Sequence, residues 1–343
     1  MRAAVMRGGE IVSDTIPDPV PSAGQVLVKT LACGICGSDL HALVHAAEMS
    51  ALAEAAGSPF FSMDLERDVV MGHEFCAEIV EFGPGTSQTL KKGDRVCSLP
   101  IVFHPGGVAG IGYSNDFPGG YGELMVLSEP TQLRVSDDFS TEEAALTEPM
   151  AVGIHAVAKA NLQPADVPLV VGCGPVGLAV VAALRLAGRE PIIAADFSAK
   201  RRGLAEHLGA HLVVDPKQQT AIEAWSEEAG DGTAVIFECV GVPGLIPQLM
   251  FDAPPGARIV VAGVCMEDDR IQPMVGIYKE INLQFVLGYT PEEFNAAFRA
   301  LGEGKIDAAP LITGKVGVDE VADFFQRLKS PDEHAKVLVE PWR

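Results

Sequence analysis

The chain has 343 residues, of which 48% are hydrophobic and 21% are charged, and its formal net charge is −21. This length is too great for one ordinary hydrophobic core, so we expect about two domains. Nucleic acids and anionic membranes attract basic faces, and the acidic balance therefore argues against both as partners. The composition is that of a soluble globular protein.

The cysteines and the apolar stretches indicate where the protein works. The seven cysteines are an odd number scattered along the chain, so they form no disulfide framework and fit a reducing compartment. The N-terminus reaches Gly8, Gly9 and Glu10 before any apolar run long enough for a signal peptide. Glycines and prolines interrupt the uncharged stretch 167–184, which makes a membrane-spanning helix improbable there. We expect a cytoplasmic protein.

Up to about residue 150 the chain has the texture of β structure. Short runs of Val, Ile and Thr alternate with Gly and Pro, and they predict strands over 24–33, 76–85 and 91–99. A helix start is predicted within 140–149, where Ser140 and Glu143 have the spacing of a capping box.

From about residue 153 the pattern changes to short apolar runs separated by helical stretches. The runs cover 167–171, 190–196, 210–215, 233–239 and 256–263, and the clearest helices 175–188 and 198–210. Strands alternating with helices predict βαβ units and a parallel sheet covered on both faces. After about residue 298 we expect a polar helix over 319–330 and a strand over 335–341.

The stretch VVGCGPVG places Gly172, Gly174 and Gly177 in a G-x-G-x-x-G pattern that follows an apolar strand and opens a helix with Pro175 and Val176. In that setting the glycines provide a tight turn, room for a pyrophosphate and close helix–strand packing. The helix N-terminus supplies amide donors to the phosphates. A glycine-rich turn without a ligand is the alternative interpretation, but the whole arrangement favours a dinucleotide site.

Asp196 ends the next predicted strand, about 20 residues after the glycines, where a carboxylate accepts hydrogen bonds from an adenosine ribose. A 2′-phosphate would meet its negative charge, so NAD is favoured over NADP. Lys200, Arg201 and Arg202 weaken this preference without reversing it, and we include Arg201 among the cofactor-binding candidates.

Three further motifs share the chain with this fingerprint: GICGSDLH at 34–41, GHE at 72–74 and TEP at 147–149. In this order the four motifs resemble the zinc-dependent medium-chain alcohol dehydrogenases, closest to the sorbitol and threonine dehydrogenase branches. The resemblance covers essentially the whole chain. It implies an α/β protein, with a β-rich GroES-like catalytic domain at 1–152 and 298–343. The doubly wound, parallel-sheet Rossmann domain would lie at 153–297.

The resemblance implies that Cys36, His73 and Glu148 are ligands of one catalytic zinc, with Glu74 as a fourth or alternating ligand. Cys33 would pack rather than bind metal. A thiolate, an imidazole and carboxylates form the mixed set typical of a catalytic zinc with an open position. Taken singly, each of these residues also fits a purely structural role: a buried cysteine, a strand-end histidine and a helix-end carboxylate.

Many members of this family hold a second, structural zinc with four closely spaced cysteines. Here the corresponding segment has Cys97 as its only cysteine, so we predict that the structural zinc is absent.

The resemblance also assigns proton-handling roles. Ser38 would hydrogen-bond the substrate oxygen, and His41 would receive the proton through the nicotinamide ribose. Asp39 would orient the His73 ring and raise its basicity. Ser38 and His41 could instead be plain loop residues. The family assembles this site in a cleft between its two domains and forms dimers through the edge strand of the Rossmann sheet, which here is residues 281–289.

Residues 42–71 form a longer link than the family usually has, and we expect a short helix and a loop there. Its apolar residues could line a substrate pocket, pack into the core or meet a partner subunit; these residues are Val44, Met49, Leu52, Phe60, Phe61 and Met63.

We therefore predict an NAD-dependent zinc enzyme that transfers hydride between a secondary alcohol or its ketone and the cofactor, and that forms a homodimer or homotetramer. A zinc-free quinone or enoyl reductase on the same scaffold and a non-catalytic dinucleotide-binding redox sensor are the alternatives. Substrate identity is beyond the sequence.

Overall fold

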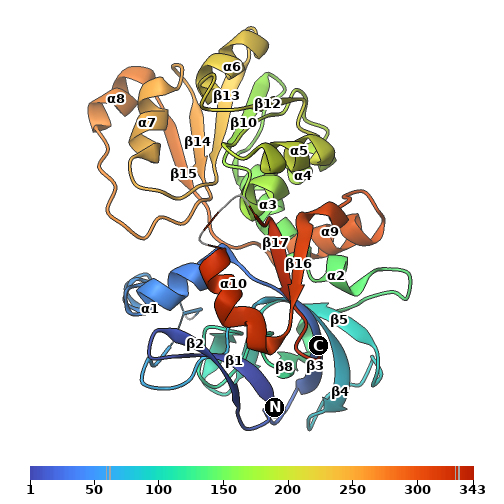
Figure 1. The fold of residues 1–343 in the computed structure, drawn as a ribbon. Helices are drawn as coiled ribbons and strands as arrows, with labels where there is room; N and C mark the ends of the chain where they lie inside the picture. Colours follow the sequence, from blue (N-terminus) through green and yellow to red (C-terminus); the bar gives the residue numbers. More distant parts are fainter. Residues whose placement is uncertain (59, 62, 329, 331–332) are drawn as a thin grey trace. The chain divides into compact units, whose positions relative to one another are not determined.

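The computed structural model describes residues 1–343 except 59, 62, 329 and 331–332. The chain divides into two compact units, one made of Met1–Glu148 with Ile312–Arg343 and the other of Pro149–Leu311 (Figure 1). The second unit is thus longer than the predicted 153–297 segment. It includes the helix α9 (Pro291–Gly302), whose Glu293 binds His155 of the same unit.

A six-stranded parallel sheet forms the centre of the second unit. Its strands run in the order β12-β11-β10-β13-β14-β15, so the order reverses beside β10. The strands are β10 (Asp166–Val171), β11 (Ile193–Ala195), β12 (Leu212–Val214), β13 (Thr233–Glu238), β14 (Arg258–Val261) and β15 (Asn282–Phe285). In such sheets the point of reversal is where nucleotides bind.

Helices cover this sheet. They are α3 (Thr147–Lys159), α4 (Pro175–Leu186), α5 (Ala199–Leu208), α6 (Ala221–Glu228), α7 (Leu245–Asp252), α8 (Pro273–Lys279) and α9, followed by the 3₁₀ turn Ala309–Leu311. Leu169, Ile236 and Ile259 of three central strands share a core with α6 and α7. The alternate residues Val170 and Phe237 are also buried, because parallel strands are covered on both faces.

The first unit is built on a seven-stranded sheet with the order β16-β17-β3-β4-β5-β9, in which β8 pairs with β3. These strands are β3 (Gln25–Gly34), β4 (Glu74–Phe82), β5 (Arg95–Ser98), β8 (Leu124–Ser128), β9 (Gln132–Arg134), β16 (Ile312–Val316) and β17 (Lys336–Val339). Two hairpins accompany the sheet, β1 (Arg2–Arg7) with β2 (Glu10–Thr15) and β6 (Ile101–His104) with β7 (Gly107–Gly110). The C-terminal strand β17 pairs with β3, which brings the last residues of the chain to the end of β3.

The helices of the first unit are α1 (Gly37–Ala55), α2 (Thr141–Ala144) and α10 (Val321–Arg327), with 3₁₀ turns at Glu129–Thr131 and Val318–Glu320. At the predicted helix start, the Ser140 hydroxyl accepts a hydrogen bond from the Glu143 amide and caps α2. Among the helices that the structure describes, none is both long and apolar enough to cross a lipid bilayer.

The link at 42–71 differs from the expected short helix, because most of its first half continues α1 to Ala55 with a kink at His45. Ala42, Ala46 and Met49 recur at helical spacing and are buried. Val44 and Leu52 face outward, with 66% and 58% of their surfaces exposed.

Candidate active site

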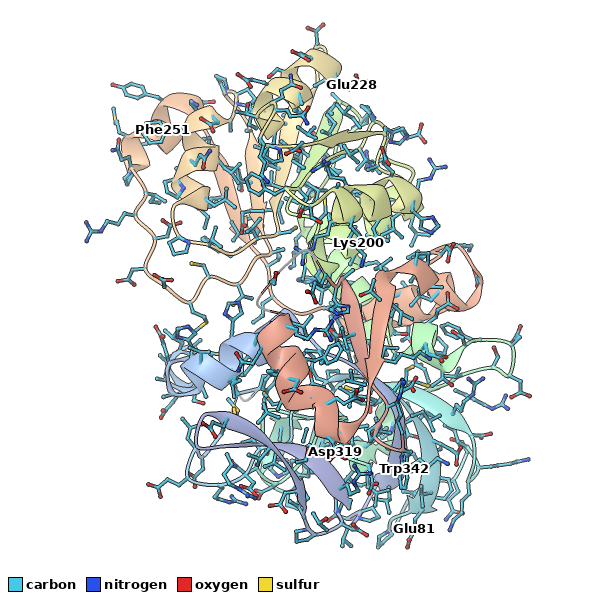
Figure 2. The ribbon with its side chains drawn as sticks, viewed as in Figure 1. Glu81, Lys200, Glu228, Phe251, Asp319 and Trp342 are labelled. Carbon is cyan, nitrogen blue, oxygen red and sulfur yellow. The ribbon has the colours of Figure 1, made fainter. Side chains whose placement is uncertain are left out.

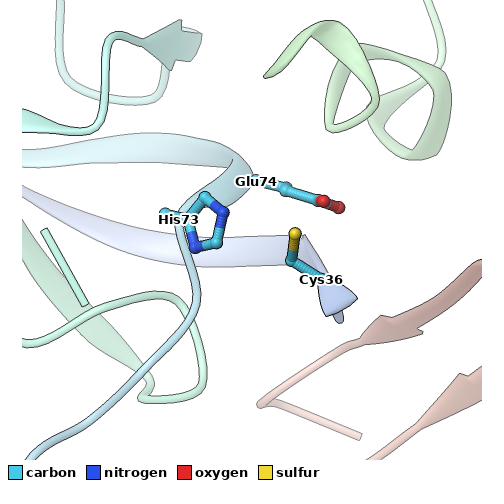
Figure 3. Close-up of side chains that lie close together, drawn as sticks. All are labelled: Cys36, His73 and Glu74. Carbon is cyan, nitrogen blue, oxygen red and sulfur yellow. The ribbon is translucent and has the colours of Figure 1, made fainter. Parts of the chain in front are cut away.

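Three predicted metal ligands meet in the first unit. Cys36 caps the start of α1 two residues after β3 ends, and His73 and Glu74 stand where β4 begins. Because Gly34 lies opposite Glu74 in the antiparallel β3–β4 pair, the two segments come together there. One ligand atom of each of the three residues lies within 4.8 Å of the others (Figure 3), and no other such group of histidine, cysteine or acidic side chains occurs in the described part of the chain.

The close approach of Glu74 depends on a glycine in the opposite strand. A Cβ atom on Gly34 would collide with the Glu74 carboxylate, and every residue other than glycine carries one. The glycine inside the stretch CGIC is therefore part of the site's construction.

The donor set fits a zinc ion. Nδ1 of His73 lies 3.5 Å from Asp39 Oδ1, which leaves Nε2 facing the Cys36 thiol and the Glu74 carboxylate (Figure 3). His73 Nδ1 is buried and has no hydrogen-bond partner. Zinc in proteins is held by this combination of sulfur, imidazole nitrogen and carboxylate oxygen, and mixed sets are typical of catalytic sites.

Asp39 is fully buried beside this group. Its carboxylate accepts hydrogen bonds from the hydroxyls of Tyr113 (2.8 Å) and Tyr121 (2.6 Å) and from the Cys36 amide (3.1 Å). Burial alone would raise the pKa of Asp39, but His73 and the two tyrosines outweigh it and lower that pKa. Asp39 therefore stays an anion against the His73 ring.

Two of the predicted ligands, His73 and Cys36, hold their protons more tightly than exposed groups do. Burial would lower the pKa of His73, but the Asp39 carboxylate opposes this and raises it well above its usual range. Burial raises the pKa of the Cys36 thiol, and the nearby Glu74 adds to the rise. A metal ion binding here must displace these protons.

Lys336, which the sequence analysis missed, is the partner of Glu74. Its ammonium lies 2.7 and 2.6 Å from the two carboxylate oxygens of Glu74 and donates to the Ile35 carbonyl at 3.2 Å. The Lys336 and Glu74 side chains are 2% and 1% exposed. Burial acts to lower the pKa of Lys336, but Glu74 raises it overall, so Lys336 stays an ammonium. In the sequence, the charged Lys336 inside the apolar run AKVLVEP was the feature that could have indicated a buried acidic partner.

Glu148 stands in the first turn of α3 and does not belong to the three-residue group. Its charge contributes, after that of Glu74, to the raised pKa of Lys336, so it acts on the same buried cluster. Its role as a zinc ligand stays a prediction. Cys33 is fully buried, and its thiol lies 3.7 Å from the Gly34 carbonyl.

Ser38 and His41 follow Cys36 in α1. The Ser38 hydroxyl lies 2.8 Å from the Tyr113 hydroxyl, a contact that no sequence pattern predicts. His41 is partly buried; burial lowers its pKa, and the neighbouring His45 lowers it further. A neutral imidazole is the form that can accept a proton.

The glycine-rich turn of the second unit joins β10 to α4. A Cβ atom on Gly177 would collide with the Gly172 carbonyl, so helix and turn pack as closely as the motif requires. Gly174 is the N-cap residue of α4, directly before Pro175 and Val176, and its backbone is extended. A Cβ atom on Gly174 would meet only Arg201 Nη1, at 3.9 Å. The turn therefore leaves free space above the N-terminus of α4, as a phosphate-binding turn does.

Asp196 follows β11, and its carboxylate reaches this turn by accepting a hydrogen bond from the Cys173 amide (2.7 Å). It also accepts one from the amide of Ser198, two residues further along the chain (2.8 Å). The Arg201 Nε atom is buried and unpartnered, whereas Arg202 pairs with Asp215 at 3.3 Å. The structure thus brings Asp196 and Arg201 to the glycine-rich turn.

Comparisons with known proteins agree with this architecture. Residues 22–137 match the family model of the alcohol dehydrogenase GroES-like domain, and residues 175–303 match that of the zinc-binding dehydrogenases. The fold predicted from the sequence, a GroES-like domain with a parallel-sheet nucleotide-binding domain, is confirmed.

The chain is 33% identical to a (R,R)-butanediol dehydrogenase of Bacillus subtilis, and the match covers 97% of each chain. Its structure resembles the crystal structure of 2R,3R-butanediol dehydrogenase from Bacillus subtilis, with a TM-score of 0.83, 31% identity and 99% coverage of both chains. It also resembles a putative zinc-binding dehydrogenase from Sinorhizobium meliloti solved with NADP, with a TM-score of 0.83, 26% identity and 99% coverage of both chains. The predicted family is confirmed: the chain belongs to the zinc-dependent medium-chain alcohol dehydrogenases, and it is an alcohol oxidoreductase that uses a nicotinamide dinucleotide.

Proposed function

We propose that the protein oxidises secondary alcohols, vicinal diols such as butane-2,3-diol among them, and reduces the corresponding ketones with NAD(H). The meeting of Cys36, His73 and Glu74 within 4.8 Å is the observation that carries this proposal, since it supplies a mixed metal-ligand set. The similarity to the (R,R)-butanediol dehydrogenase of Bacillus subtilis supports the substrate class.

Cys36, His73 and Glu148 would hold one zinc ion per chain, with Glu74 as a fourth or alternating ligand. The ion supplies a Lewis acid that lowers the pKa of an alcohol hydroxyl toward neutrality. Lys336 holds both oxygens of Glu74 and therefore competes for that carboxylate. By holding Glu74, Lys336 would help to leave a ligand position free for the alcohol.

The remaining polar residues handle orientation and the proton. Asp39, whose carboxylate lies 3.5 Å from His73 Nδ1, would hold that side of the ring by charge and keep Nε2 turned toward the Cys36 thiol. Ser38 hydrogen-bonds the substrate oxygen. His41, whose pKa is lowered by burial, accepts the proton released on oxidation and passes it to solvent.

The dinucleotide would lie on the turn formed by Gly172, Gly174, Pro175, Val176 and Gly177. We infer a preference for NAD because the Asp196 carboxylate reaches that turn and would repel a 2′-phosphate. Arg201 would contribute positive charge to the diphosphate.

Neither of the two alternative functions, a zinc-free reductase or a non-catalytic sensor, accounts for these residues. A zinc-free reductase has no use for a buried thiol, imidazole and carboxylate facing one another, and a non-catalytic sensor has no use for the Ser38 and His41 pair. The discriminating experiment incubates the purified protein with NAD or NADP and each stereoisomer of butane-2,3-diol. We expect NADH formation, with little from 2-methylpropan-2-ol, whose carbinol carbon has no hydrogen to transfer. Zinc-loaded protein that yields no reduced cofactor from any secondary alcohol would overturn the proposal.

Copies of the chain would associate through β15. This strand pairs with β14 on one side and, in the described part of the chain, with no strand on the other. Apolar side chains around it are exposed, and they are Met274, Ile277, Tyr278, Phe285 and Leu287. Phe251, labelled in Figure 2, is exposed on α7, which packs beside α8. An uncovered apolar edge of this kind is typical of subunit pairing.

Light scattering would measure this association. We expect a dimer or tetramer, and a shift toward monomer when Phe285→Lys places a charge on the edge strand. A wild-type monomer at micromolar concentration would contradict the proposal.

A further inference from the structure

Tyr113 joins the residue proposed to touch the substrate to the buried carboxylate behind the metal site. It lies in the segment between β7 and β8 and is 1% exposed. Its hydroxyl is 2.8 Å from the Ser38 hydroxyl and 2.8 Å from Asp39 Oδ1. Three side chains thus form one continuous chain of hydrogen bonds.

The direction of that chain follows from the number of hydrogens. A phenol has one hydrogen, and a carboxylate can only accept, so Tyr113 donates to Asp39. The hydrogen between Ser38 and Tyr113 must then belong to Ser38. With its own hydrogen directed at Tyr113, the Ser38 oxygen offers only lone pairs to an incoming hydroxyl.

Packing holds Tyr113 in this position. Its ring lies against the rings of Phe61 and Phe60, with centroids 4.6 and 6.0 Å away, and against the His73 ring at 5.2 Å. Phe60 and Phe61 belong to the long link at 42–71. Aromatic contacts at these separations are favourable, and they restrict how the phenol can turn.

We propose that Tyr113 is a positioning residue for alcohol oxidation: it fixes the Ser38 side chain and accepts the Ser38 hydroxyl hydrogen, so that Ser38 receives the alcohol as a hydrogen-bond donor. The long link supports the site through Phe60 and Phe61. This inference rests on the proposed function, in which Ser38 meets the substrate oxygen. Asp39 is the anchor of the chain and stays an anion, accepting hydrogen bonds from two tyrosine hydroxyls and the Cys36 amide. The proton released on oxidation would leave toward His41, after the Ser38 hydroxyl turns away from Tyr113.

The experiment measures both reaction directions in Y113F, which keeps the ring and loses only the hydroxyl. Y113F should weaken the alcohol complex, in which the alcohol hydroxyl donates to the oriented Ser38, so the alcohol KM should rise about three- to tenfold. The alkoxide that loses hydride has no hydrogen to donate to Ser38, so kcat should rise with KM and kcat/KM should stay nearly constant. The ketone has no such hydrogen either, so the kinetic constants of reduction should change little, as the fixed equilibrium constant requires.

Two further variants separate positioning from mere support of Asp39. Y121F removes the other phenol hydrogen bond to the same carboxylate, whereas Ser38 bonds to Tyr113. A larger effect of Y113F than of Y121F on the alcohol KM would therefore measure the link to Ser38. In an S38A background, Y113F should add no further increase in the alcohol KM. Thermal unfolding of each variant checks that the fold persists, and F61L, which loosens the Tyr113 ring, should shift the alcohol KM in the same direction by a smaller factor.

Failure of the inference differs from failure of the proposed function. A wild-type protein that oxidises no secondary alcohol would overturn the proposed function itself. If S38A raises the alcohol KM while Y113F behaves like Y121F, or if the Y113F and S38A effects simply add, the role of Tyr113 is wrong and the proposed function stands.

Discussion

The Lys336 ammonium is bound to both carboxylate oxygens of Glu74, at 2.7 and 2.6 Å, with both side chains buried at the candidate metal site. The two residues are 262 positions apart in the chain, and the pairing of both β17 and β4 with β3 brings them together. A carboxylate held in this way is available to a metal only in competition with the lysine.

Replacing Lys336 by Met should destabilise the zinc-free protein by about 3–5 kcal/mol, because it leaves the Glu74 charge buried without its partner. Zinc would offer Glu74 a new partner. The increase in unfolding free energy on adding zinc, measured by denaturant titration, should therefore be larger in K336M than in the wild type.

The matched control is the double variant K336M/E74Q, which removes both charges and should recover most of the lost stability. K336M protein as stable as the wild type without zinc would show that the buried pair has no energetic role.

The two cysteines of the C-x-x-C stretch should behave differently. C36A removes a predicted zinc ligand, so zinc content should fall to near zero and the rate of alcohol oxidation should fall at least about 100-fold. C33A removes only a buried thiol and should cost about 1–2 kcal/mol of stability while zinc stays bound. Metal analysis of both variants settles the matter, and loss of zinc in C33A with retention in C36A would reverse the assignment.

Zinc affinity should rise with pH. The pKa of His73 is raised by Asp39 against the effect of burial, and the pKa of Cys36 is raised by burial, so both groups carry protons near neutral pH. Each displaced proton makes the apparent affinity rise about tenfold per pH unit until that pKa is passed. Competition with a zinc chelator at pH 6 and pH 7 would measure the change, and equal affinities at the two pH values would be incompatible with these protonation states.

Asp196→Asn should change cofactor preference. The loss of the carboxylate weakens hydrogen bonding to the ribose and removes the repulsion of a 2′-phosphate, so the KM for NAD should rise about tenfold and that for NADP should fall. The KM for the alcohol, which the proposal places with the residues of the first unit, is the internal control. An unchanged NAD/NADP ratio would remove Asp196 from the specificity argument.

The sequence predicted well those features of the fold that depend on residues close together in the chain. The parallel strands from β10 to β14 and the glycine-rich turn follow from hydrophobic period and turn residues, whereas the approach of Cys36 to His73 was implied by the family resemblance. The capping of α2 by Ser140 was also foreseen, because capping depends on residues close in the chain.

The contacts that sequence reasoning missed join residues far apart in the chain. Lys336 reaches Glu74 only because β17 lies beside β3, and Tyr113 reaches Asp39 and Ser38 from the segment before β8. The hydrophobic pattern of neither segment indicates which distant residue its polar side chain contacts. The helix in the link is longer than the short helix predicted, because it continues α1 through a kink at His45 to Ala55.

Zinc content measured beside the rate of NADH formation from butane-2,3-diol, as zinc is withdrawn by a chelator and then restored, tests the central claim most directly. The account predicts about one zinc per chain, with activity that is lost and regained in proportion to it. Full activity in protein freed of zinc would contradict the account.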